Sequence, residues 1–312
     1  MASGQERVLR RRIKSVQSTK KITRAMELIA ASRIVKAQQR VAAARPYSEQ
    51  ITEVIRQLAA SGAGLDHPLL QPRDEVKNVG FIAVTADRGL AGAYNASIIR
   101  TVERAVAERR GQGSDYTLVV AGKKAESYFR WRGYNLAYAG TGFSEQPHYQ
   151  HAKDLADVVI EQYQEGGIDE VQLVYTRFLS MGTQRVVSRK LLPLDTGAIA
   201  ERSDEGPSAA YEFEPEPNEI LEQLLPRFVE ARVFAALLEA AASEQAARQR
   251  AMKAATDNAE ELIKNLSIDA NKLRQAGITT EIMEIVGGAE ALRQAGRAQP
   301  ESEAFRDMEQ SA

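Results

Sequence analysis

Hydrophobic residues near the C-terminus recur at the spacing of a long amphipathic helix. Residues 227–276 contain neither Gly nor Pro, and 14 of these positions are Ala. Because Gly and Pro destabilise helix interiors and Ala favours them, we expect one unbroken helix about 75 Å long. Steps of three and four residues between its apolar positions are typical of a coiled-coil seam, the line along which two helices touch. The predicted seam comprises Leu221, Leu225, Phe228, Phe234, Leu237, Ala241, Ala255, Ala259, Leu262 or Ile263, Leu266, Leu273 and Ala276.

A second long helix is predicted at the N-terminus, where residues 5–45 also lack Gly and Pro. Its apolar rhythm continues past Pro46, where we expect a kink, and reaches Leu58. Two such helices can pair antiparallel, although a seam rich in Ala buries little area and predicts only modest stability. A generic coiled-coil spacer explains this periodicity equally well. The apolar positions are Leu9, Ile13, Val16, Ile22, Met26, Ile29, Ile34, Ala37, Val41, Ile51, Ile55 and Leu58.

Between the two helices the pattern changes to short buried runs that alternate with amphipathic helices. We predict strands at 79–85, 117–121, 135–138, 170–178 and 184–193, and helices at 96–110, 123–131 and 149–165. This alternation is typical of a largely parallel sheet covered by helices. The expected fold class is α/β: a long antiparallel coiled coil of the N- and C-terminal helices plus an inserted Rossmann-like α/β domain.

The corresponding domain boundaries follow from these elements and from the Gly- and Pro-rich segments between them. We expect an N-terminal coiled-coil helix at 1–60, an α/β globular domain at 74–195, a loop at 196–218, a C-terminal coiled-coil helix at 219–292 and a flexible tail at 293–312. Pro226 is expected to kink the C-terminal helix or to occupy its first turn.

Charge is distributed unevenly along the chain. Residues 1–45 carry twelve Lys or Arg against Glu6 and Glu27, so this segment is +10 and the remainder −11. A transit peptide is disfavoured because the apolar rhythm continues beyond it. A nucleic-acid arm stays possible, but stacking aromatic residues are missing from the basic face, so acidic protein partners are favoured. Without Cys there is no disulfide or thiolate metal site, and no apolar run of about 18 residues predicts a membrane span.

Motifs for catalysis are weak. Residues 87–92, Asp-Arg-Gly-Leu-Ala-Gly, lie between a strand and a helix, as nucleotide-binding loops do, but do not match the dinucleotide pattern. Residues 122–124 fail the phosphate-loop pattern. His148, His151 and Asp154 have a spacing that metal ligands can use, yet an exposed helix start is the simpler interpretation. We therefore expect no catalytic, cofactor-binding or metal-binding residues, and a scaffold rather than an enzyme.

Several blocks of the sequence resemble the gamma subunit of the F-type rotary ATP synthase, in its bacterial form. The resemblance runs from about residue 4 to 292, with all blocks in order. The blocks are residues 12–16, 19–27, 30–32, 87–90, 243–248, 251–259 and 278–292. It implies a non-catalytic central rotor shaft without cofactors, which couples proton-driven rotation of the c-ring to ATP synthesis or hydrolysis. Implied partners are the hexamer of three alpha and three beta subunits, the epsilon subunit and the c-ring, with no nucleic acid.

The same resemblance implies a peripheral position on the cytoplasmic face of the bacterial cell membrane, with membrane contact only through the complex. By matching motif, Lys21, Arg24, Met26 and Arg248 would face the moving domains of the beta subunits. The polar positions expected at the upper collar of the ring are Arg248, Gln275, Thr279 and Glu284. The foot residues expected to meet the c-ring and epsilon are Tyr211, Phe213 and Glu214. A coiled-coil adaptor or a nucleic-acid-binding scaffold is the alternative function.

Overall fold

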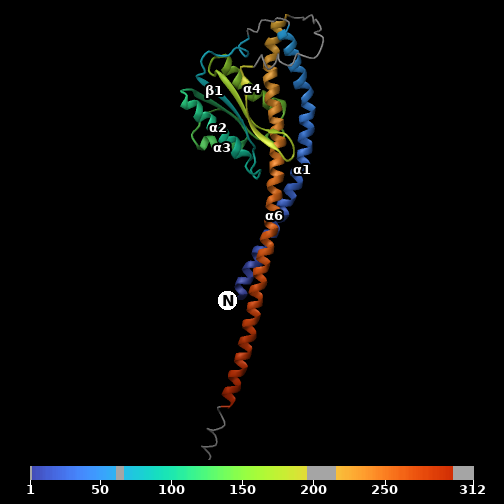
Figure 1. The fold of residues 1–312 in the computed structure, drawn as a ribbon, viewed down its shortest axis with the longest axis vertical. Coiled ribbons are helices and arrows are strands. Elements are labelled where there is room, and N and C mark those ends of the chain that lie inside the picture. Colours follow the sequence, from blue (N-terminus) through green and yellow to red (C-terminus); the bar gives the residue numbers. More distant parts are fainter. Residues whose placement is uncertain (1, 61–66, 195–215, 298–312) are drawn as a thin grey trace, which may run out of the picture. The chain divides into compact units, whose positions relative to one another are not determined.

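The structure, a computed structural model, describes residues 2–60, 67–194 and 216–297 (Figure 1). The chain divides into two compact units. Unit 1 comprises Met1–Arg24 and Ala254–Ala312, and unit 2 comprises Ala25–Lys253. Helices α1 (Ala2–Ala60) and α6 (Pro217–Arg297) each contribute to both units.

Unit 2 is built on a five-stranded sheet with the strand order β3-β2-β1-β4-β5. Strands β3, β2, β1 and β4 are parallel to one another, whereas β5 pairs antiparallel with β4. The strands are β1 (Asn78–Val84), β2 (Asp115–Ala121), β3 (Leu136–Gly140), β4 (Glu170–Phe178) and β5 (Gln184–Leu192). The helices between them are α2 (Tyr94–Gly111), α3 (Lys123–Trp131) and α4 (Tyr149–Gln164). The predicted α/β fold class, with long terminal helices and an inserted sheet domain, is confirmed.

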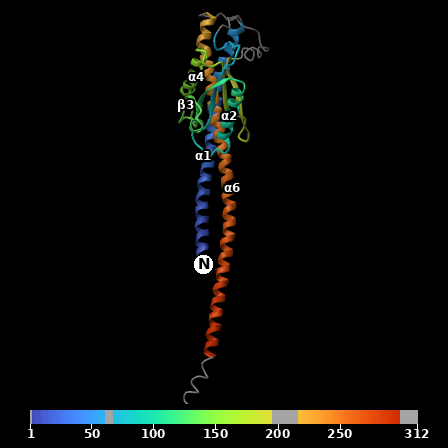
Figure 2. The ribbon, with the colours of Figure 1, turned by 90° about the vertical axis from the view of Figure 1, so that its left-hand side faces the viewer.

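Alternate residues of each strand face two different hydrophobic clusters. In β1, Val79, Phe81 and Ala83 pack with α2 and α3, while Ile82 and Val84 pack with α4, α1 and α6. Figure 2 shows α2 and α4 on opposite sides of the sheet. Because the side-chain period of a strand is two, a run of apolar residues such as that of β1 supplies both faces at once.

Two prolines lie within the long helices. Helix α1 continues through Pro46, and Pro226 lies within α6 rather than in its first turn. Helix α6 also extends to Arg297, so residues 293–297 of the predicted tail are helical, while 298–312 lie outside the described residues. Packing explains why the two helices tolerate a proline. Ile51 and Ile55 of α1 and Phe228 of α6 belong to one buried cluster of unit 2, which stabilises both helices close to their prolines.

Unit 1 is an antiparallel pair formed by the start of α1 and the second half of α6. Buried or half-buried positions recur on both helices in alternating steps of four and three residues, the seven-residue repeat of a left-handed coiled coil. On α1 these positions are Leu9, Ile13, Val16, Lys20 and Thr23; on α6 they are Thr256, Ala259, Ile263, Leu266, Ala270 and Leu273. None of the described helices is both long and apolar enough to cross a bilayer.

Candidate partner-contact surfaces

A polar layer interrupts the seam of unit 1. The hydroxyl oxygens of Thr23 and Thr256 are 2.8 Å apart and hydrogen-bonded, with both residues buried. Beside them, Lys20 Nζ lies 3.2 Å from a carboxylate oxygen of Glu260. These contacts fix which residue of α1 faces which residue of α6, because a polar layer is satisfied in one register only. The sequence prediction missed Thr23 and Thr256, since both are polar.

Two apolar residues of α1 that the sequence pattern placed in the seam lie outside it, and Ala276 of the predicted α6 seam is also exposed. Ile22 is 59 % exposed and Ile29 53 % exposed. The seam passes instead through Lys20, Thr23 and Glu27, because these positions continue the strict repeat set by the apolar residues before them. Within unit 2, helix α1 presents an exposed apolar set, here called the outer stripe: Leu28, Ile29 and Val35.

The predicted beta-contact residues of α1 come shortly before this outer stripe in the sequence. Lys21 and Arg24 are exposed, and Met26 is half-buried. Exposed Lys and Arg residues continue on both sides of them along α1. An apolar stripe bordered by cations suits a partner whose surface combines an apolar groove with acidic residues. Contact of these three residues with a partner stays a prediction.

Arg248 has intramolecular partners that its motif did not predict. It is 6 % exposed, and its guanidinium donates to Glu244 Oε1 at 2.7 Å and to the carbonyl oxygen of Gly89 at 3.2 Å. Glu145 lies 3.9 Å from the same guanidinium and also pairs with Arg33 of α1. Burial raises the pKa of the Glu244 carboxyl, although Arg248 opposes this shift. Arg248 thus joins α6 to the turn after β1.

The turn that resembles a nucleotide-binding loop is occupied by internal hydrogen bonds. The Asp87 carboxylate accepts backbone N–H groups from Lys123 at 3.0 Å, Gly142 at 2.9 Å and Ser144 at 2.9 Å. Burial alone would raise the pKa of Asp87, but these hydrogen bonds outweigh it and the pKa is lowered. The backbone N–H at the start of α3 therefore binds a side chain of the protein itself, in the manner of a tight strand-to-helix turn.

The histidines at the start of α4 take part in local contacts. His151 Nδ1 accepts the backbone N–H of His148 at 3.1 Å, and the His151 ring stacks on Phe143 with centroids 4.3 Å apart. Asp154 Oδ1 accepts a hydrogen bond from the Gln150 side chain at 2.8 Å. The described residues contain no group of three His, Asp or Glu arranged to hold a metal ion.

The last part of α6 extends beyond its partner helix. Helix α1 begins 21 residues before Thr23, whereas α6 continues 41 residues beyond Thr256. At equal rise, about 20 residues at the end of α6 therefore have no partner helix among the described residues. Every residue whose exposure is described from 278 to 295 is exposed. We call this segment the overhang; its large apolar side chains are Ile278, Ile282, Met283, Ile285, Val286 and Leu292.

The collar residues predicted on α6 lie at or near the overhang. Gln275, Thr279 and Glu284 are exposed, and the Thr279 hydroxyl donates to the carbonyl oxygen of Gln275 at 3.0 Å. Lys21 and Arg24 lie at the level of Thr256, about 28 Å along the helix from Gln275. The predicted contacts of unit 1 therefore fall into two zones: one around Lys21 and Arg24, and one that begins at Gln275 and continues along the overhang. Tyr211, Phe213 and Glu214 lie outside the described residues.

Comparison with known sequences gives one consistent result. Residues 5–292 match the family described as ATP synthase. A protein of Frankia casuarinae named ATP synthase gamma chain is 52 % identical over 294 residues, which cover 93 % of this chain and 98 % of that protein. A protein of Mycolicibacterium smegmatis with the same name is 48 % identical over 300 residues, covering 92 % and 97 % of the two chains.

Solved structures extend the similarity to the fold. A chain from the central stalk and c-ring of the Tetrahymena thermophila mitochondrial ATP synthase is 25 % identical, with a TM-score of 0.57, and the match covers 75 % of this chain and 99 % of that one. A chain from the Euglena gracilis mitochondrial enzyme, in an assembly of OSCP, F1 and c-ring, is 19 % identical with a TM-score of 0.66; the match covers 94 % of this chain and 96 % of that one.

Proposed function

The chain belongs to the family of ATP synthase gamma chains, and from this premise we propose that it is the central rotor shaft of an F-type ATP synthase. In this role it couples rotation of the c-ring to ATP synthesis or hydrolysis in a ring of three alpha and three beta subunits. The match over residues 5–292 and the shared fold of the central-stalk chains support the proposal.

The observation that carries the proposal is the overhang. Met283 is 68 % exposed and Leu292 76 % exposed on a helix end without a partner helix in the described chain. Exposed apolar patches of this kind mark interaction sites. A ring of subunits that encloses the overhang supplies the missing apolar cover, with Gln275, Thr279 and Glu284 as its polar contacts.

Contacts near the outer stripe form the second zone. Lys21, Arg24 and Met26 face the moving domains of the beta subunits, where acidic groups complement the +10 charge of residues 1–45. Arg248 contributes to these contacts indirectly, because its guanidinium donates a hydrogen bond to the carbonyl oxygen of Gly89 and so holds the turn after β1 in place. Tyr211, Phe213 and Glu214 contact the c-ring and the epsilon subunit, which places the chain peripherally on the cytoplasmic face of a bacterial membrane.

The proposed mechanism is differential contact. A shaft with one basic helix and one overhanging helix presents a different surface to each of the three beta subunits. Each surface favours one beta conformation, so rotation shifts their populations in sequence. The shaft itself carries out no chemistry, and the occupation of the Lys123 N–H by Asp87 supports this non-catalytic role.

Co-expression with the alpha and beta subunits of the same organism tests the proposal. We expect ATPase activity of the purified complex to depend on this chain, at one copy for every three beta subunits. The chain alone should show no ATPase activity. Equal activity without the chain would refute the proposal and favour the adaptor alternative, which predicts tight binding to another target in the absence of alpha and beta.

A further inference from the structure

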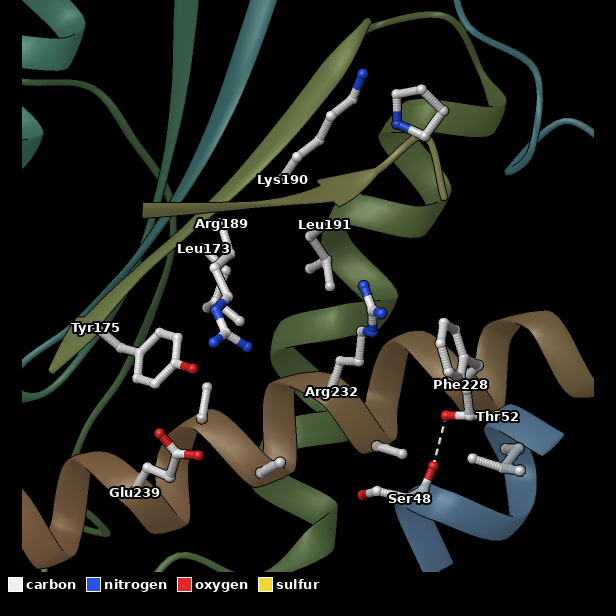
Figure 3. A pocket seen from close by; sticks show the side chains of 15 residues that line it. Ser48, Thr52, Leu173, Tyr175, Arg189, Lys190, Leu191, Phe228, Arg232 and Glu239 are labelled. Carbon is white, nitrogen blue, oxygen red and sulfur yellow. Dashed lines mark hydrogen bonds between the residues drawn. The ribbon is translucent and has the colours of Figure 1, made fainter. Parts of the chain in front are cut away.

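Two cavities of similar size open in unit 2, and they differ in how their polar groups are satisfied. The first, of about 440 Å³, lies between β5, β4, α6 and a short stretch of α1 (Figure 3). Several of its polar groups already have partners within the chain. The Glu239 carboxylate accepts hydrogen bonds from the Tyr175 hydroxyl and the Phe178 backbone, and the Thr52 hydroxyl donates to the carbonyl oxygen of Ser48. A ligand in this cavity would compete with those contacts.

The second cavity, of about 450 Å³, contains a buried hydroxyl without a partner. It lies between the first turn of α2, the strands β4 and β5, and α6. Thr176 of β4 lines it and is 5 % exposed, and its Oγ1 has no hydrogen-bond partner among the described residues. Because side chains alternate along a strand, Thr176 shares a face with Val174, which packs in the cluster that includes α2. A buried hydroxyl without a partner is unfavourable, so a polar ligand in the cavity would gain by satisfying it.

The start of α2 provides backbone donors to the same cavity. This helix has 18 residues, no acidic residue in its first turn and no side chain that caps its N-terminus. The Asn95 side chain is occupied elsewhere, since its Oδ1 accepts the backbone N–H of Ala86 at 2.9 Å. Ala93 and Ser97 of this turn line the cavity. The first N–H groups of a helix and the positive end of its dipole favour an anion at such a terminus.

Helix α6 adds a positive charge. Arg250 lines the cavity, and its guanidinium donates to the carbonyl oxygens of Met181 at 2.9 Å and Gly182 at 3.3 Å, and to the side-chain oxygen of Gln184. All three partners are uncharged, so none of them neutralises the guanidinium. The residues that line the cavity include no Asp or Glu. The charge of the cavity therefore favours an anionic ligand.

Small apolar side chains complete the walls. Val186 of β5 and Ala247 and Ala251 of α6 line the cavity beside the polar groups. An inorganic ion would leave these side chains in contact with water, whereas an organic group attached to the anion would cover them. A volume of about 450 Å³ lies within the range of small-molecule sites, which combine apolar walls with a few placed polar groups.

We propose that this cavity binds a small phosphate monoester with an apolar organic part. A phosphate monoester carries about −1.5 to −2 charges at pH 7 and three acceptor oxygens. These oxygens accept from the backbone at the start of α2 and from the Thr176 hydroxyl, while Arg250 balances the charge and the organic part lies against Val186 and Ala247. A carboxylate has fewer oxygens and less charge to offer. No residue of this site is among the partner contacts proposed above.

The first test is calorimetric titration of the purified full chain with phenyl phosphate. We expect saturable binding of one molecule per chain. Thr176→Val, which keeps the shape of the side chain but removes the hydroxyl, should weaken this binding about tenfold. The same variant should unfold at the wild-type temperature or above it, because the hydroxyl has no partner within the described chain to lose. Unchanged affinity in Thr176→Val would overturn the proposal.

A second variant tests the helix terminus. Ala93→Asp adds a carboxylate at the start of α2, where it repels the phosphate and competes for the same N–H groups, so the affinity should fall at least about tenfold. Stability should be retained, since the helix dipole favours this charge. Ala107→Asp adds the same charge to an exposed position of α2 outside the cavity and should change the affinity less than about twofold. An equal loss in the two variants would refute a site at the helix start.

Three further compounds test the chemistry of the ligand. Phenol lacks the anion, benzoate carries a carboxylate in place of the phosphate, and inorganic phosphate lacks the ring. Each should bind at least about tenfold more weakly than phenyl phosphate. Equal binding of any of the three, or no saturable binding of phenyl phosphate, would overturn the proposal.

Discussion

The hydroxyl groups of Thr23 and Thr256 are hydrogen-bonded across the seam of unit 1 at 2.8 Å. Thr256→Val should destabilise this helix pair by about 1 kcal/mol, because it removes one partner from a buried hydrogen bond. The double variant Thr23→Val with Thr256→Val should cost less than the single one, since two apolar groups of similar shape replace both partners. Hydrogen exchange of the unit 1 amides measures both effects. If the double variant lost more stability than Thr256→Val alone, the hydrogen bond between the two hydroxyl groups would not explain the stability of the polar layer.

Reversal of three exposed charges on α1 tests the basic helix. Changing Arg11, Lys14 and Lys21 together to Glu should weaken assembly with alpha and beta about tenfold or more at low salt. The loss should shrink as salt rises, because exposed charges are screened beyond about 10 Å at 0.1 M ionic strength. Affinity is measured by surface binding at two salt concentrations.

A charge-matched control comes from the α/β domain. Arg100, Arg104 and Lys124 are also exposed, and their reversal changes the net charge by the same amount. Assembly should be little affected in that variant. An equal loss in the two variants would mean that total charge, and not the face of α1, determines assembly.

Truncation distinguishes the overhang from the residues that follow it. Removing residues 278–312 should leave the unfolding free energy of the isolated chain unchanged, because the overhang contacts no partner helix in the described chain. The same truncation should lower the ATPase activity and thermal stability of the complex with alpha and beta. Removing only residues 298–312 should change neither. A large loss of stability in the isolated 1–277 chain would refute the view that the overhang is unpartnered.

Gly122 is required by the turn between β2 and α3. Its φ is +98°, and a Cβ there would lie 2.2 Å from the carbonyl oxygen of Thr85. Gly122→Ala should therefore cost about 3 kcal/mol or more, since strain and a backbone clash add. Gly133 has a φ of +75° with open space around it, so Gly133→Ala should cost only about 1 kcal/mol. Denaturant unfolding of the two variants gives the comparison.

The hydrogen bonds of Asp87 predict a pH dependence of stability. Its pKa is lowered in the folded state from an ordinary value of 3.8. A carboxyl with a lowered folded pKa stabilises the fold above the unfolded pKa, and this contribution disappears as pH falls through the folded pKa. The unfolding free energy of wild type should therefore exceed that of Asp87→Asn near neutral pH, and the difference should shrink below about pH 4. A pH-independent difference would contradict this role.

Sequence patterns were sufficient for the sheet and insufficient for the seam. The strand predicted at 170–178 and the helix predicted at 123–131 match β4 and α3. Both predictions succeed because the spacing of apolar residues within one short segment is enough to indicate the element. Hydrophobicity alone predicts Ile22 and Ile29 in the seam, whereas the seven-residue repeat leaves both residues outside it. The seven-residue repeat continues through polar residues when a partner helix satisfies them, as Thr256 satisfies Thr23.

Arg248 illustrates a limit of a different kind. A motif indicates which residue type occupies a position but not what surrounds it. Glu244 lies one helical turn away and is readable from sequence, whereas Gly89 and Glu145 come from distant segments. The surroundings of a buried charge depend on tertiary packing, so the intramolecular role of Arg248 could not be derived from periodicity or motif.

The unequal lengths of the two helices in unit 1 also have a mechanical consequence. Where α1 and α6 run side by side, a twisting load is shared by two backbones joined through the seam. Beyond the level of Ala2, where α1 begins, α6 is the one backbone among the described residues that carries the load. A lone helix resists bending and twisting less than a packed pair, so the proposed rotor role requires the ring of subunits to supply the stiffness that the overhang lacks.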